Sequence, residues 1–367
     1  MNRFTVTGKV GEGCFGTVLS GYYNATGSQV ALKKVPINRL DEGLPSCVVR
    51  EMLSLQRLNH PHIVRLLEAF PSGSSMVLVT EHCARDLQAL MKCMHPNCRM
   101  PFGDALTYLW MVLLALDHCH SNGVLHRDIK PSNLLVTASR QLKLADFGLA
   151  RIYDADADMT HEVATRWYRA VELLFGERRY GPSVDMWSVG CVFAEMLAGC
   201  GNCVLFAGEG DIDQINKIFR VLGTPTEDCW PGVTTLPDWG KIIFPDHPGE
   251  GLDNLFPDVP AVAIDLLSKL LSLDPKKRIS ARQALLHPVF RNSPAPFRIR
   301  VAPPVLDEFP SIHQIVSGKL LRFGSNPPVT LPSSMEEFSQ CNALLLPFGV
   351  LESPDEESIE SASSESA

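Results

Sequence analysis

The chain has 367 residues, of which 45% are hydrophobic, and a formal net charge of −8. Six acids and no Lys or Arg lie within 351–367, so the rest of the chain is close to neutral, and the absence of a basic stripe argues against nucleic-acid binding. Eleven scattered cysteines favour reduced thiols, and no signal peptide or stretch of about 18 apolar residues is present, so we expect no secretion and no membrane binding.

The first eighty residues predict a small sheet lobe. Runs rich in β-forming residues, broken by turn residues, predict three antiparallel strands within 4–35, and 63–70 and 76–81 predict two more. Between these groups, Pro45 fits the first turn of a helix that ends near Leu58. A five-stranded lobe with one main helix is therefore expected.

Helices dominate from Asp104 onward. Asp104 is the expected cap of an apolar helix that ends at Asn122-Gly123, and a second apolar helix is expected from Asp185 to Leu197. Helical periodicity continues through 212–221 and 262–273. Because helices that are apolar nearly all round must be buried, these segments predict a large α-helical lobe.

The fold class expected from these elements is α+β with two lobes. The sheet lobe is assigned to 1–83 and the helical lobe to 84–290. The prolines of 291–350 predict an extended segment packed on the domain, and the Ser- and Glu-rich residues 351–367 predict a disordered tail.

Two short segments, 126–133 and 143–148, carry chemical groups that phosphoryl transfer requires. Asp128 is a candidate base for a hydroxyl nucleophile, and Lys130 would place a positive charge beside the moving phosphoryl group. Hard oxygen ligands for Mg²⁺ are offered by Asn133 and Asp146.

A glycine-rich motif and a lysine precede these segments. The motif joins two strands instead of a strand and a helix, which favours a flap over ATP phosphates rather than a dinucleotide-binding turn. It consists of Gly11, Gly13, Gly16 and the nearby Val18. Lys33 follows in an apolar strand, and Glu51 on the next helix is its predicted partner, so that the pair directs the ammonium towards the α and β phosphates.

In their order and spacing, these motifs resemble the eukaryotic protein kinase family over residues 4 to about 290. The resemblance implies the two-lobed protein kinase fold, ATP and Mg²⁺ as cofactors, and a catalytic set of Lys33, Glu51, Asp128 and Lys130. Lys130 together with Thr165 is similar to the serine/threonine type. The implied nucleotide-binding residues are Val10, Gly11, Gly13, Gly16, Val18, Ala31, Lys33, Thr80, Glu81, Cys83, Asp86 and Leu135.

Residues 160–169 resemble an activation segment. The resemblance implies that an upstream kinase phosphorylates Thr160, and that three arginines converge as a receptor for the phosphate. These arginines are Arg50, Arg127 and Arg151. Trp167-Tyr168-Arg169 resembles the proline-directed group, in which Arg169 holds the Val163 region so that Pro is favoured after the target Ser or Thr.

Within that group the chain is similar to cyclin-dependent kinases, and most similar to the cell-cycle-related kinase branch through 141–151, 162–169, 236–242 and 346–348. This implies Ser/Thr-Pro protein substrates in cell-cycle or ciliary control. It also makes a cyclin-like subunit a candidate partner, and the cytoplasm, nucleus and cilium candidate locations. Two alternatives stay open: a mitogen-activated-type kinase, although the chain lacks its Thr-x-Tyr pair, and a pseudokinase scaffold, which the intact catalytic set disfavours.

Val171 stands where the resemblance expects the Pro of Ala-Pro-Glu. Glu172 remains, and Arg278 is its expected buried partner, so we expect a modest effect on stability with activity retained.

Overall fold

A computed structural model describes residues 3–13, 16–37, 44–93, 100–154, 157–161, 163–198 and 204–291. The predictions of a packed extension beyond Arg291 and of a disordered tail at 351–367 lie outside these residues. No helix in the described ranges is long and apolar enough to cross a membrane.

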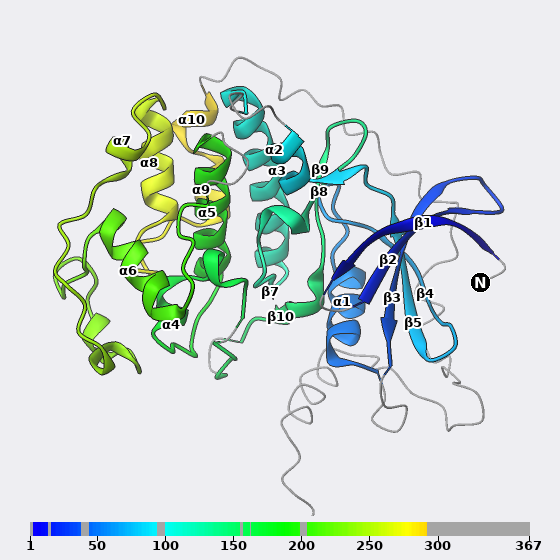
Figure 1. Ribbon diagram of the computed structural model, residues 1–367, viewed down its shortest axis with the longest axis horizontal. Coiled ribbons are helices and arrows are strands. Elements are labelled where there is room, and N and C mark those ends of the chain that lie inside the picture. The colour runs from blue at the N-terminus through cyan, green and yellow to red at the C-terminus, as the bar shows by residue number, and fades with distance from the viewer. Residues whose placement is uncertain are drawn as a thin grey trace, which may run out of the picture.

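The N-terminal lobe is the predicted five-stranded antiparallel sheet, in the order β1-β2-β3-β5-β4, with one helix beside it (Figure 1). Its elements are β1 Phe4–Gly13, β2 Gly16–Tyr23, β3 Gln29–Pro36, α1 Ser46–Arg57, β4 Leu66–Pro71 and β5 Ser75–Glu81. Strand β3 buries Val30 and Leu32 on one face of the sheet, with the alternation expected of a strand, whereas Val35 packs in the other core cluster. On α1, Val48, Met52 and Leu55 are buried.

The strand predicted at 63–70 begins later than expected, at Leu66. Ile63 instead forms a parallel bridge with Leu144, and Val64 N donates to the Leu144 carbonyl over 2.8 Å. These apolar residues therefore serve the junction between the lobes, which a local pattern of β-forming residues cannot reveal.

The C-terminal lobe is mainly helical, as predicted, and Figure 1 shows it beside the sheet lobe. Its short strands are β6 Arg85–Asp86, β7 Val124–Leu125, β8 Leu134–Val136, β9 Leu142–Leu144 and β10 Arg151–Ile152. Its helices are α2 Leu87–Cys93, α3 Phe102–Ser121, α4 Val171–Leu174, α5 Ser183–Ala198, α6 Asp211–Leu222, α7 Leu252–Leu255, α8 Ala261–Leu270, α9 Ala281–Leu285 and α10 Pro288–Arg291.

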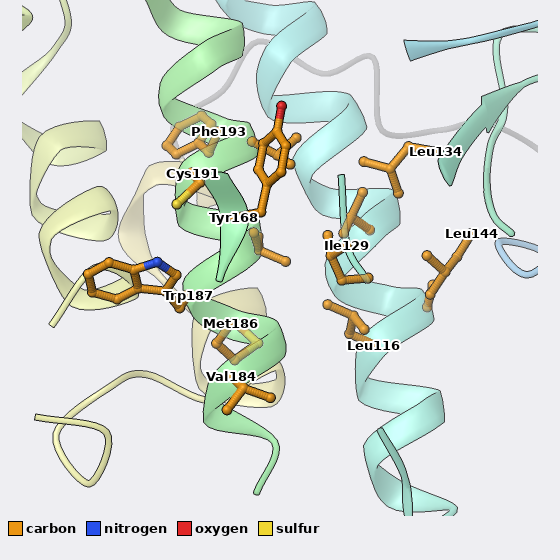
Figure 2. Close-up of a cluster of buried hydrophobic side chains, with 14 of the residues drawn as sticks. Leu116, Ile129, Leu134, Leu144, Tyr168, Val184, Met186, Trp187, Cys191 and Phe193 are labelled. Atoms are coloured by element: carbon orange, nitrogen blue, oxygen red, sulfur yellow. The ribbon is translucent and has the colours of Figure 1, made fainter. Parts of the chain in front are cut away.

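Helices α3 and α5 form the centre of this lobe. Figure 2 shows α5 side chains, including Trp187 and Phe193, and Leu116 of α3 in one buried cluster, and all three are fully buried. Burial of each such side chain stabilises the fold by about 2–3 kcal/mol. The prediction that Asp104 caps α3 was wrong, because the helix begins at Phe102 and Asp104 lies in its first turn, where a carboxylate favours the helix dipole.

Candidate active site

Lys33, Glu51 and Asp146 meet between the lobes. The ammonium of Lys33 in β3 lies 2.7 Å from Glu51 Oε2 on α1 and 2.8 Å from Asp146 Oδ1. The predicted Lys33–Glu51 pair is therefore present. Its extension to Asp146 joins the sheet lobe to the segment after β9.

The charges of this triad are mutually supported. Burial acts to lower the pKa of Lys33, but the two carboxylates outweigh it and the pKa is raised. Burial likewise acts to raise the pKa of Asp146, but Lys33 outweighs it and the pKa is lowered. At neutral pH the site therefore holds a cationic lysine beside an ionised aspartate, which is the state needed to bind phosphate and a metal ion.

Asp128 is buried and fully engaged. Its Oδ2 lies 2.8 Å from Lys130 Nζ and accepts a 2.9 Å hydrogen bond from Asn133 Nδ2. Its Oδ1 accepts from the backbone N and the Oγ1 of Thr165, each over 3.1 Å. Lys130 Nζ also donates to Thr165 Oγ1 over 3.0 Å. The Thr165 hydroxyl thus contacts the Asp128 oxygen that a substrate hydroxyl would need to contact for proton transfer.

Asp185 holds the segment 126–133, which carries Asp128, in place, and the sequence did not reveal this function. Asp185 of α5 is fully buried and accepts backbone hydrogen bonds from His126 N over 3.0 Å and Arg127 N over 2.8 Å. Its Oδ2 also lies 2.9 Å from His120 Nε2. Arg127 has a positive φ of 64°, a conformation that costs a non-glycine residue about 1–3 kcal/mol, and these bonds hold it there. From the sequence, Asp185 was interpreted only as the start of a helix. An acid in an otherwise apolar helix was the feature that could have indicated a buried hydrogen-bonding function.

Asn133 and Asp146 fit a Mg²⁺ site with two protein ligands. Asn133 uses its amide nitrogen to donate to Asp128, and Asp146 uses Oδ1 to accept from Lys33. The Oδ1 of Asn133 and the Oδ2 of Asp146 therefore stay available to a cation. Mg²⁺ usually keeps several waters and is bound by one or two protein oxygens plus substrate phosphates, so two such ligands suffice for a site of this kind. Within the described ranges no group of three or more His, Cys, Asp or Glu that could hold a metal is found.

The residues predicted to hold a nucleotide lie on β1, β2 and β3, at and just after the end of β5, on β6 and on β8. Gly13 and Gly16 close the β1–β2 hairpin, and a Cβ at Gly16 would lie 2.2 Å from the Lys34 carbonyl oxygen, so this turn requires glycine. Ala31 and Thr80 are paired across β3 and β5, and Leu135 is half-buried on β8. Val10 is 61% exposed.

Two of the predicted nucleotide-binding side chains have protein partners. Asp86 Oδ1 accepts from Ala89 N over 2.6 Å and so satisfies a free amide at the start of α2, leaving its second oxygen for a ribose. The carboxylate of Glu81 pairs with Lys143, an interaction that the sequence did not predict. Burial, with a smaller contribution from Glu81, raises the pKa of the Cys83 thiol to about 12, so Cys83 stays protonated.

The three arginines predicted to bind a phosphate on Thr160 lie close to one another. Burial and then the charges of Arg127 and Arg151 lower the pKa of Arg50, and burial and then Arg127 lower that of Arg151. Arg50 Nε is buried and has no hydrogen-bond acceptor within the described residues. Tyr180 links this cluster to the activation segment, because its hydroxyl accepts from Arg127 over 2.9 Å and donates to the Thr160 carbonyl over 2.5 Å.

Arg169 holds the Val163 region as predicted. Its Nε donates to the Val163 carbonyl over 2.9 Å and its second terminal nitrogen to the Ala164 carbonyl over 3.2 Å. Ala164 has a positive φ of 65°, which is unusual for a residue with a side chain. Arg169 therefore stabilises a strained turn beside Thr165.

The predicted pair beneath this segment is also present. Arg278 donates two parallel bonds to Glu172, of 2.7 and 2.9 Å, and both side chains are buried. Val171 is fully buried, so the residue that replaces proline contributes apolar packing there.

A two-lobed fold with this lysine–carboxylate triad and this aspartate–asparagine loop defines a protein kinase. Residues 4–290 match the protein kinase domain. The chain is 44% identical over 301 residues to "Cyclin-dependent kinase 20" of Danio rerio, covering 81% of this chain and 86% of that protein. It is 43% identical over 296 residues to "Cyclin-dependent kinase D-1" of Arabidopsis thaliana, covering 80% and 73%.

Among solved structures, the chain is similar to one described as "Structure of the CAK complex form Chaetomium thermophilum bound to ATP-gamma-S". The TM-score is 0.74 at 39% identity, over 81% of this chain and 93% of that chain. The chain belongs to the cyclin-dependent kinase family of eukaryotic protein kinases, and it is a serine/threonine protein kinase.

Proposed function

We propose that this kinase transfers the γ-phosphoryl group of Mg-ATP to Ser or Thr residues that precede Pro, and that phosphorylation of Thr160 by another kinase activates it. Asp128 would orient the substrate hydroxyl and accept its proton, and Lys130 would stabilise charge on the transferred group. The close contacts of both side chains with the Thr165 hydroxyl support these roles.

Nucleotide binding would use the gap between the lobes. Lys33, kept charged by its carboxylates, would bind the α and β phosphates beneath the glycine-rich turn. Asn133 and Asp146 would hold Mg²⁺ through their available oxygens. When bound, the ion would neutralise charge on the β and γ phosphates.

The observation that supports proline direction is the turn at Ala164. Its positive φ turns the local backbone out of the extended conformation, and Arg169 occupies the carbonyl oxygens of Val163 and Ala164. The backbone acceptors next to Thr165 are thus already bonded, so a substrate residue that donates an amide hydrogen there would lose its bond to water without replacement. Proline has no amide hydrogen and avoids this loss.

Matched peptides test this proposal. The Thr160-phosphorylated protein is assayed on two peptides that differ only in Pro or Ala after the target Ser, and we expect kcat/KM to be at least about tenfold higher for Pro. Arg169→Met should reduce that ratio, whereas Arg140→Met, which changes an exposed arginine far from the turn, should leave it unchanged. Equal kcat/KM values for the two peptides in the wild-type protein would contradict proline direction.

We also propose a cyclin-like protein as the activating partner, and substrates in cell-cycle or ciliary control, reached in the cytoplasm, nucleus or cilium. The support is membership of the cyclin-dependent kinase family. Affinity purification from cells followed by mass spectrometry tests this, and a cyclin-like protein at a one-to-one ratio is the expected result. Full activity of the purified, Thr160-phosphorylated chain alone would contradict a required cyclin.

A further inference from the structure

The carboxylate of Glu81 connects three segments at the end of β5. Glu81 is the last residue of β5, and its Oε1 accepts from Lys143 Nζ over 2.8 Å and from the backbone N of Arg65 over 2.9 Å. The Glu81 backbone N donates to the Arg65 carbonyl over 3.2 Å. One oxygen thus receives a β9 side chain and the backbone just before β4.

This ion pair crosses from one lobe to the other. Lys143 lies at the centre of β9, directly opposite Leu135 of β8. Glu81 follows Thr80 on β5 and pairs with Val30 of β3. The pair therefore joins the strand that carries Thr80 to the three-stranded β6-β8-β9 sheet that carries Leu135, and both residues are among those implied to bind the nucleotide.

The pair differs from the surface ion pairs of this protein. The side chains of Lys143 and Glu81 are 12% and 27% exposed, whereas those of Arg179 and Asp158, which also pair, are 70% and 61% exposed. Water screens the pair less, and the bond from Arg65 N already fixes the carboxylate, so less side-chain entropy is lost when Lys143 binds it.

We propose that Lys143 is a positioning residue for ATP: by pairing with Glu81, it fixes the distance between the β5 end and β8, and so the spacing of Thr80 and Leu135, two of the residues proposed to bind the nucleotide. Without this pair, the two strands can separate and the nucleotide loses packing contacts. Asp128 and its partners do not contact Lys143, and Asp146 is held independently by Lys33, so the chemical step and peptide binding should be retained. This inference rests on the proposed nucleotide site, and it does not depend on the substrate sequence.

The test compares Lys143→Met, Lys143→Arg and, as a control, Lys269→Met, which removes an exposed pair with Asp265 on α8. Each protein is assayed for kcat, for the KM of ATP and of peptide, and for direct binding of a fluorescent ATP analogue. For Lys143→Met we expect the KM of ATP and the Kd of the analogue to rise about fivefold to tenfold, with kcat and the peptide KM within about twofold of wild type. Lys143→Arg should restore most of the affinity, and Lys269→Met should match wild type.

Glu81→Gln provides a second arm, because its amide oxygen can still accept from Arg65 N. We expect it to weaken nucleotide binding less than Lys143→Met, and the double variant to bind no more weakly than Lys143→Met alone, since both changes remove one interaction. Wild-type affinity in Lys143→Met, or an equal rise in the KM of ATP and of peptide, would overturn the positioning role. Failure of the wild-type protein to bind the analogue would instead overturn the proposed nucleotide site.

Discussion

The catalytic centre and the arginine cluster share the segment 126–133, which carries both Arg127 and Asp128, and they differ in how their charges are compensated. Asp128, Lys130 and Thr165 satisfy one another through hydrogen bonds of 2.8–3.1 Å. Burial and the charges of neighbouring arginines instead lower the pKa of Arg50 and Arg151, and Arg50 Nε has no acceptor in the described part of the chain. The first region is complete in itself, whereas the second has an excess of positive charge that an added phosphate would neutralise.

The largest expected effect comes from removing the proton acceptor of the complete region. Asp128→Asn keeps the size of the side chain and loses the carboxylate, so we expect kcat to fall by about a thousandfold or more while ATP still binds. Single-turnover kinetics together with a nucleotide-binding assay separate these two quantities. Turnover equal to wild type would remove the base assignment.

Asp185→Ala should destabilise the segment that carries Asp128. Without the carboxylate, the buried amides of His126 and Arg127 lose their acceptor while Arg127 remains strained, so we expect a loss of about 3 kcal/mol in the free energy of unfolding, measured in urea. Asp185→Asn retains an acceptor oxygen and should lose less. A loss below about 0.5 kcal/mol in Asp185→Ala would show that other contacts hold the loop.

The Asp185 carboxylate also predicts how stability depends on pH. Burial acts to raise the pKa of Asp185, but the hydrogen bond and charge of His120, then His126 and the Arg127 amide, outweigh it, so the pKa is lowered in the folded protein. A lowered folded pKa contributes stability that is fully present above the unfolded value of about 3.9 and is lost as the pH falls through the folded value. Stability measured between pH 5 and pH 3 should therefore decline less steeply in Asp185→Asn than in wild type. An equal slope would assign the acid sensitivity to other groups.

Thr160→Ala tests the arginine cluster. Without a phosphate acceptor the arginines stay uncompensated, and we expect kcat/KM on a Ser-Pro peptide to fall by about tenfold or more relative to the Thr160-phosphorylated protein. Ser at this position can be phosphorylated and should restore activity. Unchanged activity in Thr160→Ala would mean that the cluster has another role.

The smallest effect is expected from the outermost arginine. Arg151 is partly exposed, and its side chain donates a long bond of 3.4 Å to the Asp158 carbonyl, so Arg151→Met should lower the activity of the phosphorylated protein about threefold. Arg140→Met, which alters an exposed arginine outside the cluster, should have no effect. A loss as large as that of Thr160→Ala would make Arg151 a principal ligand.

Much of this molecule could be predicted from local sequence. Strands and helices followed from periodicity and turn residues. The Lys33–Glu51 pair followed from a lysine in an apolar strand and an acid on the next helix, and the Glu172–Arg278 pair from resemblance to the protein kinase family. The functions of Asp185 and Lys143 did not follow. Each acts on a partner about sixty residues away, so no nearby residue reveals it. The late start of β4 has the same cause, since Ile63 is used by a distant strand.

The central claim, that the arginine cluster binds a phosphate on Thr160, is tested most directly by phosphorus NMR of the Thr160-phosphorylated protein. The second pKa of a free phosphothreonine is about 6, and three guanidinium groups should favour the dianion. We predict a titration midpoint clearly below that of a phosphothreonine peptide, moving back towards it in Arg50→Met. A midpoint equal to or above that of the peptide would contradict the account.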